Sequence, residues 1–203
     1  MAAMKRRTRG FTVMELMVTL AIAAVLLGVG VPSFRDFMRN ARLTGAANDL
    51  LITVVTARNE AVRRQAIVSV CPTTTPDTPS TATCTSGATE GWIAFVDTDG
   101  SCLRDGAEVA DVQRNVVANM SRHSEVTTTK NGDCISFGAN GFRRVVVGQP
   151  PLLRVLFCDS RGTTEIFPSS PISFARGLEV LPTGRASVSR LQIELNSWSP
   201  SCP

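Results

Sequence analysis

The stretch that decides the fold is KRRTRGFTVMELMVTLAIAAVLLG, residues 5–28, in which basic side chains give way to an apolar run. No residue is charged from Leu16 to Phe34. These 19 residues would form roughly 28 Å of helix, close to the thickness of the hydrocarbon core of a bilayer. Because basic residues stay on the cytoplasmic side, the segment predicts one membrane crossing, with the C-terminal part of the chain outside the cytoplasm.

One carboxylate, Glu15, lies at the start of this apolar run, where burying an ionised group in lipid is costly. A small residue, Gly10, precedes the run, whereas an ordinary secretory signal has its small-residue cleavage site after the apolar core. Cleavage after Gly10 would remove the positive charges and leave Phe11 as the N-terminus. The new α-amino group of Phe11 could then pair with Glu15 of a neighbouring copy. The alternative is a plain signal anchor that tolerates Glu15 at the membrane interface.

The motif RGFTVMEL, residues 9–16, resembles the type III signal of type IV pilins and type II secretion pseudopilins. The resemblance implies that prepilin peptidase cleaves between Gly10 and Phe11 and that Phe11 is then N-methylated. It also implies a role for Glu15 in filament assembly. Pro32 resembles the helix-bending proline that many pilins carry at the same distance from the cleavage point.

The helical pattern continues beyond the membrane segment. Apolar or small residues recur in steps of three and four, which predicts a helix from about Thr12 to Arg64, roughly 80 Å long. This stripe consists of Leu43, Ala46, Ala47, Leu50, Leu51, Val54, Ala57, Ala61 and Val62, and the opposite face carries Arg39, Arg42, Asp49, Arg58, Arg63 and Arg64. Because the pattern runs through Pro32 and Gly45, we expect bends there rather than helix ends.

After Arg64 the periodicity changes to short apolar runs between turn residues, which predicts an antiparallel β domain. The expected strands are IVSVCP, GWIAFVD, RNVVANM, CISFG, FRRVVVG, LLRVLFCD, GLEVLP and ASVSRLQIEL, and the expected hairpin turns are FGANGF and LPTGRA. The predicted fold is α+β and pilin-like, with one long N-terminal helix packed on an antiparallel sheet. We expect a cleaved leader (1–10), a transmembrane part of the helix (11–34), a periplasmic half of the helix (35–64) and a periplasmic head (65–203).

Blocks of the head carry a narrower resemblance. The segments ARNEAVRRQAIVSVCP, GWIAFVDTDG, FGANGF, FCDSRG and PTGR are similar, in this order, to the family that joins pseudopilin H to the minor pilins FimT and FimU. The similarity covers most of the chain, from Phe11 to about Arg190. It implies a priming or tip-complex subunit that is present in few copies, rather than the main filament subunit.

The cysteines are scattered and form no CxxC pair. They are Cys71, Cys84, Cys102, Cys134, Cys158 and Cys202. An even number of cysteines downstream of an export segment predicts disulfides in an oxidising compartment, but the sequence leaves the pairing open. We single out a local Cys71–Cys84 loop and a Cys158–Cys202 clasp for the tail, and the alternative is that some cysteines are small buried apolar residues.

Composition and motifs indicate neither an enzyme nor a metal site, and we expect no cofactor. The loop DTDGSCLRDGAE contains Asp97, Asp99, Asp105 and Glu108, but it matches a calcium-binding EF-hand poorly, so we expect a solvated turn. The single histidine, His123, lies beside no nucleophile motif, and we expect it in a surface loop.

Nucleic-acid binding needs a basic surface, and the charges here do not supply one broadly. Four of the 21 basic residues lie in the first ten positions, so the rest of the chain balances its 17 acidic residues. Minor pilins similar to FimT are associated with DNA uptake, and the resemblance would place a basic GRxR motif near the C-terminus. In this chain's GRASVSR, Ser187 replaces the second arginine. Arg185 and Arg190 then lie on opposite faces of an alternating strand, and Arg176 and FRRVVV would add charge only if they lay nearby.

The leading hypothesis is a non-enzymatic minor pilin of a type IV pilus, inserted in the bacterial inner membrane with its head in the periplasm. The expected partners are other major and minor pilins through the N-terminal helix, prepilin peptidase, the inner-membrane assembly platform, and membrane lipid before assembly. One alternative is an H-type minor pseudopilin of a type II secretion system. The other is a DNA-binding minor pilin for DNA uptake.

Overall fold

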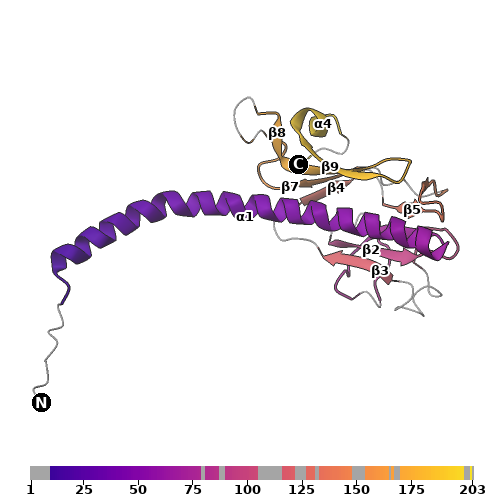
Figure 1. The fold of residues 1–203 in the computed structure, drawn as a ribbon, viewed down its shortest axis with the longest axis horizontal. Helices are drawn as coiled ribbons and strands as arrows, with labels where there is room; N and C mark the ends of the chain where they lie inside the picture. The colour runs from indigo at the N-terminus through magenta and orange to yellow at the C-terminus, as the bar shows by residue number, and fades with distance from the viewer. Residues whose placement is uncertain are drawn as a thin grey trace, which may run out of the picture. The chain divides into compact units, whose positions relative to one another are not determined.

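The computed structural model describes residues 10–78, 81–86, 90–104, 116–121, 127–130, 133–147, 154–164, 166, 170–198 and 202. The elements, in chain order, are α1 (Val13–Arg64), β1 (Val68–Thr73), β2 (Gly91–Val96), β3 (Val116–Ser121), β4 (Thr127–Lys130), β5 (Ile135–Phe137), β6 (Arg143–Arg144), β7 (Arg154–Cys158), β8 (Ile172–Val180), β9 (Ala186–Leu191) and α4 (Gln192–Asn196). The predicted α+β fold is confirmed (Figure 1). Two compact units make up the chain, one ending at Arg39 and one beginning at Asn40.

Helix α1 begins one residue after the predicted start and ends at the predicted residue, and it continues through Pro32. Its C-terminus is closed by Gln65, which has a left-handed φ of 52°, and by the amide of Ala66, which donates to the carbonyl of Ala61 at 3.2 Å. This arrangement is a Schellman motif, which satisfies carbonyls that the last helical turn leaves without partners. The chain therefore leaves the helix sharply and enters β1 after three intervening residues.

The strands form two antiparallel sheets. The first has the order β3-β2-β1-β5-β6 and the second the order β4-β7-β8-β9. In the first sheet, Val70 of β1 pairs with Ala94 of β2 on one side and with Ile135 of β5 on the other. Strand β1 is therefore central in this sheet and is covered on both faces. This explains why all of its residues are buried and why its sequence shows little alternation of apolar and polar residues.

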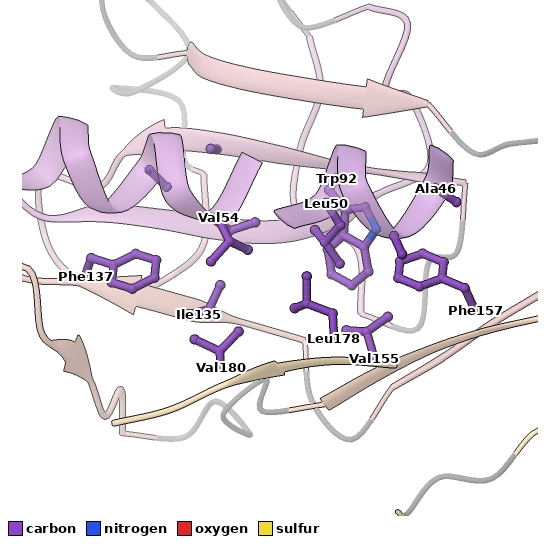
Figure 2. Close-up of a cluster of buried hydrophobic side chains, with 14 of the residues drawn as sticks. Ala46, Leu50, Val54, Trp92, Ile135, Phe137, Val155, Phe157, Leu178 and Val180 are labelled. Carbon is purple, nitrogen blue, oxygen red and sulfur yellow. The ribbon is translucent and has the colours of Figure 1, made fainter. Parts of the chain in front are cut away.

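One hydrophobic core joins the second half of α1 to both sheets. Figure 2 shows Leu50 and Val54 of the helix pointing toward side chains from the two sheets. The core residues are Leu43, Ala46, Ala47, Leu50, Val54, Ala57 and Ala61 from α1, Val68, Val70, Trp92, Ala94, Ile135 and Phe137 from the first sheet, and Val155, Phe157, Leu178 and Val180 from the second. The predicted apolar stripe thus lies on the sheets, except that Val62 is exposed.

The two predicted hairpin turns meet each other beside α1. Gly141 and Gly184 both have a left-handed φ, of 75° and 77°, which favours glycine. A Cβ on Gly184 would lie 2.3 Å from the carbonyl oxygen of Gly141, so the close approach of the turns also requires glycine. The guanidinium of Arg58 donates to that same oxygen at 2.9 Å and ties both turns to the helix.

The strand predictions were wrong in three places. In FRRVVVG only Arg143 and Arg144 form a strand, and Val147 beyond it is 98 % exposed. Strand β4, TTTK, was not predicted, because it has no apolar pattern. The last segment is not one strand to residue 195, since it turns into α4 after Leu191 and buries Leu195 against the second sheet.

All six cysteines form disulfides: Cys71–Cys84, Cys102–Cys134 and Cys158–Cys202. Their Cα atoms lie 5.4, 6.2 and 6.0 Å apart, within the usual range for a bridge. The first and third are the pairs that we singled out from the sequence. Cys158–Cys202 attaches the tail to β7, where Leu156, Leu195 and Trp198 form a second apolar cluster on the outer face of the second sheet.

Candidate functional site

The residues predicted to act in processing and assembly, Gly10, Phe11 and Glu15, lie in the N-terminal segment. Thr12 precedes the first helical residue, and its Oγ1 accepts a hydrogen bond from the amide of Glu15 at 3.1 Å. Threonine followed three residues later by glutamate is the capping-box pattern, and it fixes the start of α1 at this point. Glu15 therefore lies in the first turn, where the helix dipole favours a negative charge.

The side chain of Glu15 makes no ion pair within the described part of the chain. Phe11 is 76 % exposed, and Gly10 is exposed as well. The peptide bond between Gly10 and Phe11 thus lies outside the helix, between two exposed residues. Among the described residues Glu15 therefore has no cationic partner, and its pairing with the α-amino group of Phe11 in another copy stays a prediction.

The first half of α1 carries a continuous run of exposed apolar side chains. Every residue from 10 to 39 is exposed, and this part of the helix is long and apolar enough to cross a membrane. Its exposed large residues include Leu16, Leu20, Ile22, Val25, Leu26, Leu27, Val29 and Phe34. Such a surface is unstable in water, so lipid or other protein must cover it.

The acidic loop after β2 holds a buried carboxylate rather than the solvated turn that we expected. Asp97 is 1 % exposed, and its oxygens accept hydrogen bonds from Ser69 Oγ at 2.5 Å, Gly100 N at 2.7 Å and Cys102 N at 2.9 Å. Burial raises the pKa of Asp97, while the hydrogen bond from Ser69 opposes the shift. Asp97 thus organises the loop. Asp105, Glu108 and His123 lie outside the described residues.

The arginines considered for nucleic-acid binding are not gathered into one patch. Arg185 precedes β9 and Arg190 lies near its other end, and both are exposed. Five residues of strand separate them by about 17 Å. Arg176 is 3 % exposed, so it cannot add to a surface patch with Arg185.

Ser187, which replaces the second arginine of the GRxR pattern, lines a polar cavity instead. This cavity of about 350 Å³ lies on the outer face of the second sheet, between β7, β8, β9 and α4. Its charged lining groups are Arg154, Glu179 and Glu194, and Arg154 donates to Glu179 at 2.9 Å. Two carboxylates against one guanidinium disfavour a phosphate backbone at this point.

Sequence reasoning missed this cavity and the buried carboxylate of Asp97. Arg154 and Glu179 are opposite each other in the β7–β8 register, which the sequence does not show. The sequence did contain a signal for the buried carboxylate. Asp97 directly follows the apolar run GWIAFV, and Gly100 comes three residues after it. Aspartate in that position commonly accepts hydrogen bonds from the amides of a turn.

Comparisons with known proteins agree with these features. A model of the family described as type II transport protein GspH matches residues 46–184, and a model of the prokaryotic N-terminal methylation motif matches residues 5–31. Prepilin peptidase-dependent protein D of Escherichia coli (strain K12) is 42 % identical over 52 residues, which are 26 % of this chain. The match spans only 33 % of that relative.

Two crystal structures of the type IV minor pilin FimU from Pseudomonas aeruginosa (strain PAO1) are also similar. The first has 18 % identity and a TM-score of 0.49, and it covers 82 % of this chain and 99 % of that one. The second has 18 % identity and a TM-score of 0.46, and it covers 79 % of this chain and 100 % of that one.

Proposed function

The chain belongs to the GspH family of type II transport proteins, and from this premise we propose that it is a minor pilin that helps to assemble a type IV pilus. The observation that carries the proposal is the combination of two parts in one helix. The first half of α1 lies largely within the matched methylation motif, residues 5–31, and is apolar on all sides, while the second half is built into a folded head. A subunit of this form can enter a bundle of helices by its first half and display its head.

In this proposal prepilin peptidase cleaves between Gly10 and Phe11, and Phe11 is then N-methylated. Before assembly the apolar half of α1 crosses the inner membrane and the head lies in the periplasm, where an oxidising environment suits its disulfides. During assembly the helix passes from lipid to the helices of other pilins at the assembly platform. Glu15 of one copy then pairs with the new α-amino group of Phe11 in a neighbour, and Pro32 bends the helix.

In this proposal the role is structural, because members of this family are filament subunits. The energy of polymerisation would therefore come from partner proteins.

The test is the substitution Glu15→Ala in a strain that lacks the native copy. We expect the chain to insert in the membrane and to lose its leader as before, but to be at least tenfold depleted from sheared filaments, since about 1.4 kcal/mol of lost pairing already gives a factor of ten. Mass spectrometry of the filaments measures the amount and shows whether methylated Phe11 is the N-terminus. Leu26→Ala is the matched control, because it lies in the same helix half and carries no charge. Normal incorporation of the Glu15 variant would contradict the charge pair.

A second candidate is the H-type minor pseudopilin of a type II secretion system, which the name of the matching family favours. The same helix would then serve a short periplasmic pseudopilus. Deleting the chain and measuring both surface pili and the export of folded enzymes separates the two roles. Loss of export with intact pili would assign the chain to secretion.

A further inference from the structure

The polar cavity on the outer face of the second sheet has a floor built from three neighbouring strands. Arg154 of β7 is opposite Glu179 of β8, and Glu179 is opposite Ser187 of β9, so the three side chains form one row across the sheet. Ser189 comes two residues after Ser187 and points to the same face, because side chains alternate along a strand. The alternate positions of these strands point into the core instead.

Helix α4 and the residues after it complete the cavity. Figure 1 shows α4 beside β8 and β9, which it contacts. Leu195 and Trp198 pack directly over Gly177, where a Cβ would lie 2.4 Å from both side chains. This close contact holds the segment on the sheet, and Glu194, Ser197 and Trp198 line the cavity from that side. The cavity therefore depends on a glycine in β8 that lets a short helix approach.

The polar groups of the cavity leave acceptors without donors. Arg154 donates to Oε1 of Glu179 at 2.9 Å, and Ser189 Oγ donates to Oε2 of Glu194. Ser197 Oγ donates to the backbone carbonyl of Glu194 at 2.6 Å. Among the described residues, the second carboxylate oxygen of Glu179, that of Glu194 and the hydroxyl of Ser187 have no hydrogen-bond partner. Because an ionised carboxylate only accepts hydrogen bonds, a ligand here must offer donors.

The charge of the lining is negative, since two carboxylates face one guanidinium. Arg154 is bound to Glu179, and its guanidinium lies 5.1 Å from the centre of the Trp198 ring. Both contacts hold Arg154 in place. Glu194 has no ion pair in the described part of the chain. A ligand cation that carries N–H groups would satisfy both the charge and the acceptors, whereas an anion would be repelled.

The size and position of the cavity suit a small organic cation. Its volume is about 350 Å³, while a water molecule in the liquid occupies about 30 Å³, so an ammonium group and the alkyl chain that carries it fit inside. Glu194 and Ser197 are exposed, so the ligand can enter from solvent. The indole of Trp198 supplies an apolar wall for the methylene groups of the alkyl chain.

We propose that this cavity binds a primary ammonium group on an alkyl chain, with Glu179 and Glu194 as acceptors. Hydrogen bonds between an ammonium and a carboxylate are charge-assisted, and the three N–H donors equal in number the acceptor groups that the cavity leaves over. The ammonium belongs either to a free alkyl diamine or to a lysine side chain of another protein. This site goes beyond the proposed function and does not depend on it.

The experiment measures the binding of radiolabelled cadaverine, an alkyl diamine, to the full mature chain in a nonionic detergent by equilibrium dialysis. After Gly10 the basic and acidic residues balance, so the chain has no excess negative charge that would attract a diamine unspecifically. We expect one saturable site per chain. Tetramethylammonium has the same type of charge but no N–H donor, and it should displace cadaverine about tenfold less well than butylammonium does. Absence of saturable binding at millimolar cadaverine, or equal displacement by the two ions, would overturn the site.

Two substitutions place the binding in the cavity. Glu194→Gln keeps the shape of the side chain and should weaken binding about tenfold, because a hydrogen bond to a charged group contributes at least this factor. Ser187→Arg adds a second guanidinium to the lining and should abolish binding. Glu60→Gln is the matched control, since it removes the same charge from the end of α1 and should leave binding unchanged. Thermal unfolding shows that each variant is folded. Unchanged binding in either cavity variant, or equal weakening in the control, would overturn the site.

Competition identifies the source of the ammonium group. A capped lysine peptide that displaces cadaverine as well as butylammonium does assigns the site to a lysine of another protein, and one that displaces it about tenfold less well assigns it to a free amine. Both results support the ammonium site. Displacement by glucose would overturn it, because the cavity would then select hydroxyl groups. A chain that binds cadaverine but does not enter filaments would contradict the proposed function and leave this site intact.

Discussion

The two halves of α1 have similar secondary structure and opposite surroundings. In the half before Asn40 every described residue is exposed, and apolar side chains occupy all sides of the helix. In the half from Asn40 onward one stripe is buried against the two sheets, and charged residues occupy other positions. A helix with one apolar stripe needs one partner, and the head supplies it, whereas a helix that is apolar all round needs lipid or several other helices.

From this difference we expect the second half of α1 to stabilise the head and the first half to act in the proposed assembly. Substitutions in the second half should change the unfolding of the head, since their neighbours are on the same chain. Substitutions in the first half should leave the head unchanged and act only where other molecules are present.

The largest expected effect comes from the same substitution made in each half. Leu50→Ala removes a fully buried side chain from the core and should lower the free energy of unfolding by about 2–5 kcal/mol. Leu26→Ala, at an exposed position, should change it by less than about 0.5 kcal/mol. Denaturant unfolding of the full chain in detergent, followed by the fluorescence of the buried Trp92, measures both. Equal losses in the two variants would mean that the halves do not differ as described.

The next largest effect is expected in α4, a short helix that depends on its neighbours for stability more than α1 does. Helix α4 has five residues, too few to be stable alone, and it covers the outer face of the second sheet next to the Cys158–Cys202 disulfide. Replacing both cysteines by alanine should cost about 2–4 kcal/mol and speed the hydrogen exchange of residues 192–198. The matched control replaces Cys71 and Cys84, which should leave α4 protected. Fast exchange of α4 in the control would show that the effect is not local.

Two carboxylates sharpen the comparison, because Asp97 has its partners in the head and the side chain of Glu15 has no ion pair among the described residues. Asp97→Asn removes an acceptor for the amides of Gly100 and Cys102, and it should destabilise the head by about 1–3 kcal/mol. Glu15→Gln should leave the unfolding of the head unchanged, because the Glu15 side chain has no ion pair in the described residues. Thermal unfolding of both variants in detergent tests this. A loss of head stability in the Glu15 variant would contradict the separation of the two halves.

The sequence predicted α1 well, because its signal is local. The apolar steps of three and four and the absence of a strong helix breaker between residues 33 and 64 are visible without knowledge of the partner. The central strands were predicted for a similar reason, since β1, β2 and β7 are apolar runs that are buried on both faces. The turns at Gly141 and Gly184 were found because glycine is required there.

The features that the sequence did not predict depend on how the strands pair and on what packs against the sheet. The alternation of Leu191, Ile193 and Leu195 is typical of a strand, but Leu195 packs over Gly177, where a Cβ would lie only 2.4 Å from its side chain. Nothing local marks Gly177 as the place where a helix approaches the sheet. Arg176 likewise reads as a surface arginine until the bulge in β8 buries it. Gly10, Phe11 and Glu15 were predicted from a motif. Their roles stay predictions, because those roles depend on contacts with other molecules.

The smallest expected effect lies in the last turns of α1, where the helix leaves the core. Glu60 accepts hydrogen bonds from Arg63 and Arg64, and these lower its pKa from 4.5 to about 2. Since its pKa is lowered in the folded state, its stabilising effect is fully present above pH 4.5 and is lost as the pH falls toward 2. Exposed pairs of this spacing contribute little, so Glu60→Gln should cost about 0.5 kcal/mol at pH 7. Urea unfolding at pH 7 and at pH 2 measures this, and the difference between the two proteins should shrink at pH 2, where about half of the native carboxyl groups are protonated. A difference that is as large at pH 2 as at pH 7 would place the effect in packing rather than in the charge of Glu60.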